Sequence, residues 1–186
     1  FTGSSATSGG TISSNGGSTV TVSGIVWSTT STPTIALSTK TTNGAATGTY
    51  TSSITGLAPA TLYYVRAYAT NSIGTAYGPQ NNFTTLAIAP TISATATVIS
   101  ITGTTATSGG TITVDGGATV TSRGVVWGTT TGSSTFSATS GTGTGTYPSN
   151  LSGLSIATTY FVRSLATNSA KTAYGPEIQF ATPNTA

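Results

Sequence analysis

Apolar and polar residues alternate over short stretches along the whole chain, which is the pattern of β-strands with one buried face. In one stretch, Tyr63 and Val65 share the face that we expect to be buried. Tyr64, Arg66 and Tyr68 fall on the opposite face and are expected to point outward. The stretches are rich in Thr, Val, Ile and Tyr and are separated by Gly, Pro and Asn. The sequence therefore predicts an all-β fold.

The same order of sequence landmarks occurs twice. Residues 6–12, with the sequence Ala-Thr-Ser-Gly-Gly-Thr-Ile, recur at 106–112, and an apolar run ending in Trp27 recurs in a run ending in Trp127. The later landmarks lie slightly closer together in the second copy, and the length difference falls in the stretch 28–49. Insertions are tolerated where the backbone is exposed, so we expect a loop and an edge strand there. One copy has the length of a β-sandwich domain, and two tandem domains are predicted.

We place the domain boundary in the short apolar segment around Ile88, which gives a first domain at 1–87 and a second at 88–186. This segment has neither the Gly and Ser content of a flexible tether nor the length of a proline-rich spacer, so a stiff joint is expected. Residues 91–100 have no counterpart at the start of the first copy. We therefore expect the first domain to lack its opening strand, so that upstream chain or another subunit must cover an open edge.

Each copy carries a tight-turn signal after its first landmark. Asn15 and Asp115 are each followed by two glycines, and this combination readily takes left-handed backbone geometry. The signal predicts a hairpin between the strands on either side of the turn. Between Val22 and Ile25 the alternation shifts by one residue at Gly24, where a β-bulge is expected.

The most specific motif precedes the strand that begins near Tyr63. The run from Leu57 to Tyr63, Leu-Ala-Pro-Ala-Thr-Leu-Tyr, resembles the tyrosine corner of fibronectin type III domains. The second copy keeps Leu154 and Tyr160 but has Ile156 in place of the proline. With the other landmarks, the whole chain resembles the tandem fibronectin type III-like repeats of large secreted surface and adhesin proteins of Bacteroidota-type bacteria.

This resemblance implies two immunoglobulin-like β-sandwich domains, each with a tyrosine hydroxyl that bonds back to the preceding turn. Aromatic residues at such points of a sandwich usually fill the core rather than stack against sugars. We therefore assign six residues to the structural core: Trp27, Trp127, Tyr63, Tyr160, Leu57 and Leu154.

Charged residues make up only 4% of the chain, with five Lys and Arg against two Asp and Glu. The cations are scattered singly, unlike the clustered basic surface of a nucleic-acid-binding protein. The apolar runs are too short to insert into a membrane. A chain kept soluble by Ser, Thr, Asn and Gly is typical of secreted material at the cell surface, and an extracellular location is expected. Since the sequence contains no Met, Phe1 is expected to follow processing or to begin a segment of a longer protein.

The residue types needed for catalysis are scarce. The sequence has no His and no Cys, and its only carboxylates are Asp115 and Glu177. Two separated carboxylates supply neither an activated nucleophile nor a metal site of several oxygen ligands. We therefore expect no catalytic residue, no metal, no cofactor and no enzyme activity.

A candidate interaction surface is formed by the outward residues of the strand that follows each tyrosine corner: Tyr64, Arg66, Tyr68, Phe161 and Arg163. Exposed aromatic and arginine side chains can mark an interface. The alternative is ordinary cross-strand pairing on a solvated sheet, with each arginine lying over an aromatic ring.

These features favour a structural and adhesive segment of an extracellular bacterial surface protein or filament, in which the repeats act as stiff spacers and protein–protein interaction modules. The expected partners are neighbouring repeats of the same chain or identical subunits, and surface glycans or proteins, but no nucleic acid. Two alternatives stay open: an accessory module of a secreted glycan-active enzyme, used as a spacer or for carbohydrate binding, and a segment of a phage or fibre appendage.

Overall fold

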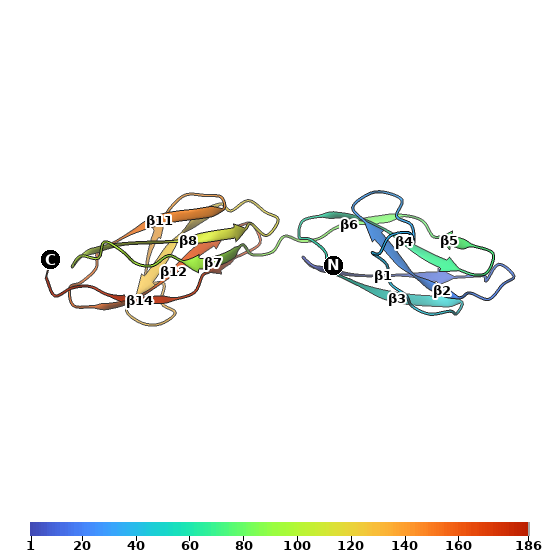
Figure 1. Ribbon diagram of the computed structural model, residues 1–186, viewed down its shortest axis with the longest axis horizontal. Coiled ribbons are helices and arrows are strands. Elements are labelled where there is room, and N and C mark those ends of the chain that lie inside the picture. Colours follow the sequence, from blue (N-terminus) through green and yellow to red (C-terminus); the bar gives the residue numbers. More distant parts are fainter. Residues whose placement is uncertain (186) are drawn as a thin grey trace. The chain divides into compact units, whose positions relative to one another are not determined.

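A computed structural model describes residues 1–185, and within them the chain forms strands and no helix (Figure 1). The predicted all-β fold is confirmed. The chain divides into two compact units, the first comprising Phe1–Leu86 and the second beginning at Ala87. Accordingly, the described part of the chain offers no helix long and apolar enough to cross a membrane.

The first unit has two antiparallel sheets that enclose an apolar core. One sheet contains only β1 and β3, and in the other β2 pairs with β4, which pairs in turn with β5 and β6. The core between them contains Ile25, Ile54 and Val65. The strands are β1 (Ser5–Ile12), β2 (Val22–Ser28), β3 (Gly48–Thr55), β4 (Leu62–Thr70), β5 (Thr75–Tyr77) and β6 (Asn81–Thr84).

The second unit repeats this arrangement with two further strands. In one sheet β8 lies between β11 and β7, as Figure 1 shows, and in the other the order is β10-β9-β12-β13 with β14 also paired to β12. Among the described residues of the first unit, no strand corresponds to β7, so β1 has β3 as its single neighbour. The strands are β7 (Thr91–Thr95), β8 (Thr105–Val114), β9 (Ser122–Gly128), β10 (Phe136–Thr139), β11 (Gly145–Ser152), β12 (Thr159–Thr167), β13 (Thr172–Tyr174) and β14 (Ile178–Ala181).

The Asn-Gly-Gly and Asp-Gly-Gly turns form, but the predicted hairpins do not. The Asn15 side chain accepts a hydrogen bond from the Gly17 N–H at 3.0 Å, and Asp115 accepts one from Gly117 at 2.9 Å. The strands joined by each turn pair with different partners, β1 with β3 and β2 with β4. Each turn therefore carries the chain from one sheet to the other, because both flanking strands have an apolar face that packs into the same core.

The β-bulge expected at Gly24 is also absent, since β2 pairs with β4 in unbroken register from Val22 to Ser28. Ile25 and Val26 lie on opposite faces of β2, and both are fully buried. The irregular alternation of the sequence therefore reflects a strand that is covered on both faces.

The hydrogen bond of a tyrosine corner is present in both units. The Tyr63 hydroxyl accepts a hydrogen bond from the Ala58 N–H at 3.0 Å, and the Tyr160 hydroxyl accepts one from Ser155 at 3.0 Å. The second corner lacks the proline of the first but has the same backbone geometry, since Ala157 has a φ of 49°, close to the 46° of Ala60. Of the six residues assigned to the core, five are buried and Trp27 is half-buried against the first core.

Candidate functional site

Four of the five residues of the candidate interaction surface lie half-buried on the outer sides of β4 and β12. Tyr64 and Arg66 belong to the first unit, and Phe161 and Arg163 occupy the equivalent positions of the second. The two sets belong to separate compact units, so each is described by itself.

Both arginines lie over a tyrosine of the neighbouring strand. The guanidinium carbon of Arg66 is 4.4 Å from the ring centre of Tyr77, and that of Arg163 is 4.6 Å from the ring centre of Tyr174. Arg66 also donates through Nε to the carbonyl of Gly78 at 3.3 Å. These contacts are the cross-strand pairing that the sequence analysis gave as the alternative to an interface.

Arg163 also fastens a loop to the sheet. Its Nη2 donates to the carbonyl of Gly132 at 2.8 Å, while Glu177 accepts a hydrogen bond from the Gly132 N–H at 2.7 Å. The Arg163 Nε and the Glu177 carboxylate are 3.9 Å apart. The charge of Arg163 is therefore directed at its own unit, whereas Tyr174, the tyrosine beside it on β13, is 48% exposed.

The expectation that Tyr68 is exposed is wrong. Its side chain does point to the outer side of β4, but only 4% of it is exposed. The ring lies across Gly24 of β2, where a Cβ atom would come within 2.9 Å of it, and the hydroxyl donates to the carbonyl of Thr41 at 2.7 Å. The segment that follows β2 thus covers Tyr68, which is a packing residue rather than a ligand contact.

In each unit, one tyrosine that was not singled out from the sequence joins the two sheets. The Tyr147 hydroxyl donates towards the carbonyls of Gly124 and Leu165, at 2.8 and 3.1 Å, and Tyr50 makes the equivalent bonds in the first unit. Gly110 makes room for this ring, because a Cβ there would lie 2.9 Å from the hydroxyl oxygen. In the sequence, the paired glycines of the repeated Ser-Gly-Gly run were the signal that a large side chain packs against this strand.

Burial raises the pKa of Tyr147 above its ordinary value of 10.0, which makes the second unit sensitive to alkali. A raised pKa in the folded state means that the stabilisation is present below pH 10 and is lost as the pH rises further. We expect Tyr147→Phe to lower the free energy of unfolding at pH 7 by about 1 kcal/mol and to weaken its fall above pH 10. Denaturant titrations from pH 7 to 11 in a Trp27→Phe background, followed by the fluorescence of Trp127, measure both effects. An unchanged alkaline slope would contradict this role of Tyr147.

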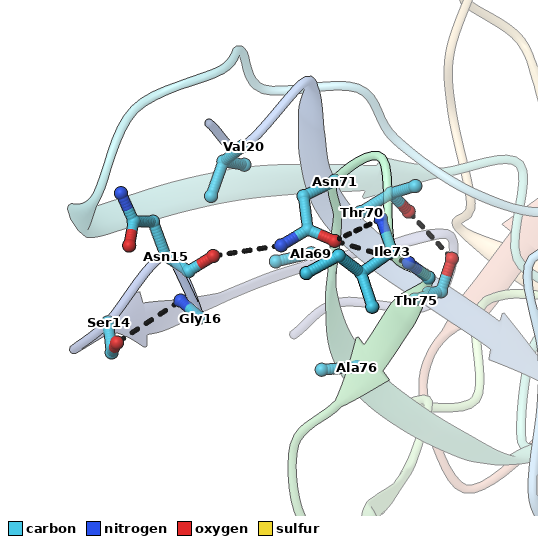
Figure 2. Close-up of a pocket in the computed structure, with 11 residues that line it drawn as sticks. Ser14, Asn15, Gly16, Val20, Ala69, Thr70, Asn71, Ile73, Thr75 and Ala76 are labelled. Carbon is cyan, nitrogen blue, oxygen red and sulfur yellow. Dashed lines mark hydrogen bonds between the residues drawn. The ribbon is translucent and has the colours of Figure 1, made fainter. Parts of the chain in front are cut away.

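A pocket of about 300 Å³ opens at the end of the first unit where the Asn-Gly-Gly turn meets the turn between β4 and β5. Figure 2 shows Asn71 bridging these turns: its Nδ2 donates to the carbonyl of Asn15 at 2.8 Å, and its Oδ1 accepts from the N–H of Ile73 at 3.0 Å. Val20 and Ala69 contribute apolar lining. The pocket is thus held by hydrogen bonds and has an apolar floor.

A second pocket, of about 290 Å³, continues along the same side of the unit. It shares Ser14, Ala69 and Ala76 with the first pocket, so the two form one groove. This groove lies beside the edge of β1 that has no partner strand among the described residues. We call it the edge groove. Its principal lining residues are Ile12, Ser14, Asn15, Gly16, Val20, Tyr50, Ala67, Ala69, Asn71 and Gly78.

These surfaces present aromatic rings, apolar side chains and backbone hydrogen-bonding groups. Within residues 1–185, His, Cys, Asp and Glu nowhere gather in a group of three or more that could hold a metal ion. The two carboxylates lie apart, and each accepts a hydrogen bond from a backbone N–H of its own unit. The edge groove offers apolar lining and a strand edge, which suit an extended peptide.

In the comparisons with known proteins, neither a family model nor a curated protein matches this chain. The functional argument therefore rests on the two units themselves.

Proposed function

We propose that the chain is a structural and adhesive segment of an extracellular bacterial surface protein or filament, built from tandem fibronectin type III-like domains of the immunoglobulin-like sandwich class. In this proposal the repeats act as stiff spacers and bind neighbouring proteins through their surfaces. The proposal rests on the resemblance in sequence, on the two compact β-units and on the hydrogen bonding of the segment that joins them.

The observation that carries the spacer proposal is the short free length of this segment. Leu86 belongs to the first unit, where its N–H donates to the carbonyl of Thr2 at 3.1 Å. Ile88 belongs to the second unit, where its N–H donates to the carbonyl of Gly116 at 2.9 Å. Only Ala87 lies between two residues whose backbones are each bonded to their own unit, and one residue supplies little of the freedom of a flexible tether.

The low charge of the surface supports an extracellular role. The sequence has five cationic side chains, and Arg66, Arg123 and Arg163 each lie over a tyrosine ring of their own unit. Few charges are thus free to bind nucleic acid or an acidic partner, and the sequence is rich in Ser, Thr and Asn.

A distance measurement between the units tests the spacer proposal. Because the sequence contains no Cys, spin labels can be attached to Ser53→Cys on β3 and Ser152→Cys on β11 without removing any native thiol. Both positions are exposed. We expect pulsed electron paramagnetic resonance to give one narrow distance distribution.

The matched control carries the same two labels and four glycine residues inserted after Ala87. Its distance distribution should be clearly broader, because the insertion restores tether freedom. If the native segment gave a distribution as broad as this control, the stiff-spacer proposal would be wrong.

A further inference from the structure

We propose that the edge groove of the first unit binds an extended strand from another copy of this repeat, with the sequence pattern of residues 88–99. This inference goes beyond the proposed function, since a spacer needs no acceptor site for a strand. It rests on a comparison within the molecule: the second unit contains the same groove with such a strand seated in it.

The strand in the second unit is fixed along the whole edge of β8. β7 pairs with β8, and beyond its end Ala96 donates through its N–H to the carbonyl of Gly109 at 3.0 Å. Ile99 and Thr107 then exchange two backbone hydrogen bonds, of 2.8 and 2.9 Å. In the first unit Gly9 and Thr7 occupy the equivalent positions of β1, at an edge that has no partner strand among the described residues. Unpaired backbone groups of this kind are the usual attachment point for an added strand.

Ile92 is the apolar anchor of the seated strand. It packs against a buried cluster in the second unit formed by Ile112, Val120, Tyr147 and Ala166. The first unit has the same four residue types at the equivalent positions: Ile12, Val20, Tyr50 and Ala69. These four line the edge groove. Whereas Ile112 is 1% exposed, Ile12 remains half-exposed.

Two equivalent glycines, one in each unit, show whether a strand fills the space beside them. A Cβ built on Gly175 of the second unit would lie 3.0 Å from a methyl group of Ile92 and 2.9 Å from the Thr95 hydroxyl. A Cβ on Gly78, the equivalent glycine of the first unit, would meet only Ala67 within 4 Å. The space that the strand fills in one unit is therefore open in the other.

The polar end of the groove also carries a hydrogen-bond donor for the incoming strand. Asn168 donates through Nδ2 to the carbonyls of Asp115 and Ile88, both at 2.7 Å, so it ties the turn to the incoming strand. In the first unit, Asn71 makes the equivalent bond to the turn, donating to the carbonyl of Asn15 at 2.8 Å. The donor that holds Ile88 in the second unit is thus in place in the first, beside the pocket of Figure 2.

One difference between the grooves predicts selectivity. In the second unit the hydroxyls of Thr95 and Ser164 lie 2.9 Å apart and are buried together. Ala67 replaces Ser164 in the first unit, so a threonine hydroxyl would lose the serine hydroxyl there but could keep a bond from the backbone N–H, which Ser164 donates to Thr95 Oγ1 at 3.0 Å. The edge groove should therefore bind a threonine at this position less tightly than a groove with serine in place of Ala67 would.

The test uses the whole chain and a fluorescent peptide with the sequence of residues 88–99, in fluorescence anisotropy titrations. We expect saturable binding, and binding weaker by about tenfold or more when Ala69→Leu fills the groove. The control Ser53→Leu adds the same side chain at an exposed position on β3 and should leave affinity unchanged. A scrambled peptide should not bind.

The selectivity is tested with a Thr95→Val peptide. Ala67→Ser should supply the missing hydroxyl and tighten binding of the unaltered peptide, and it should leave the affinity of the Thr95→Val peptide unchanged. The proposal is overturned if the peptide binds no better than its scrambled form, if Ala69→Leu leaves the affinity unchanged, or if the chain self-associates through this edge and excess peptide does not dissociate it. None of these readouts depends on how stiff the segment at Ala87 is, so this proposal and the spacer proposal can fail separately.

Discussion

Ile54→Ala is expected to destabilise the first unit by about 2–5 kcal/mol and to leave the stability of the second unit unchanged. Ile54 lies on β3 and is completely buried in the first core. Truncating a buried isoleucine removes its transfer free energy and leaves a cavity, which together cost about 2–5 kcal/mol. A small domain is stable by only about 5–15 kcal/mol, so this loss is a large fraction of its stability.

Two-dimensional NMR measures this result because the signals of each unit can be followed separately during a denaturant titration. The matched control is Ile73→Ala, the same truncation at a side chain that is 76% exposed, and it should change the free energy of unfolding by less than about 0.5 kcal/mol. Simultaneous unfolding of both units in Ile54→Ala would show that they are not independent.

Asn168→Ala is expected to destabilise the second unit by about 2–4 kcal/mol, because several buried hydrogen bonds are lost together. Asn168 is 5% exposed. Its Nδ2 bonds the carbonyls of Ile88 and Asp115, and its Oδ1 accepts from the N–H groups of Ala170 and Lys171, at 2.9 and 3.0 Å. The carbonyl of Ile88 loses its donor, so hydrogen exchange in the segment leading into β7 should also accelerate.

The first unit supplies the matched control, Asn71→Ala. Asn71 makes the equivalent bonds except the one to an incoming strand, and it is half-exposed. Water can replace part of the hydrogen bonding that Asn71→Ala removes, so the loss in the free energy of unfolding should be clearly smaller. Equal losses of stability in the two variants would mean that the bond to Ile88 contributes nothing.

The sequence was most informative where a feature depends on neighbouring residues. The tyrosine corner is an example, since Tyr63 bonds a turn only five positions earlier in the chain. The turns at Asn15 and Asp115 are similarly local, because each side chain bonds the N–H two residues ahead. Such features follow from residue type and spacing, and the duplication made them visible twice.

Features that depend on the pairing of distant strands were mispredicted. A turn of Asn-Gly-Gly fits a hairpin as well as a connection between sheets, and the choice is made by which strands β1 and β2 find as partners. The same holds for Tyr68 and Gly24. The local alternation predicted a bulge at Gly24 and an exposed aromatic at Tyr68. Instead, the Tyr68 ring packs across Gly24 of the neighbouring strand, and its hydroxyl bonds the carbonyl of Thr41.

The missing counterpart to residues 91–100 predicted an uncovered strand edge in the first unit. It did not predict which residues line the edge groove. Ile12, Tyr50 and Ala69 come from three different strands, and only the fold brings them to one side of the unit. Their equivalents in the second unit could be recognised as a set only once Ile92 was seen among them.

The strand β7 also decides how each unit would carry a tensile load. In the second unit the chain enters at Ile88, beside the residue that follows β12, and leaves at Pro183, whose carbonyl bonds the N–H of Ala157 just before β12. Tension between these points runs along the strands and loads the bonds between β7 and β8 together, in shear. In the first unit the carbonyl of Thr2 bonds the N–H of Leu86, so tension on those residues pulls neighbouring ends apart and breaks bonds in succession. A strand of another copy seated in the edge groove would likewise be bonded along β1, so that pulling the two copies apart along the strands would load those bonds together, in shear.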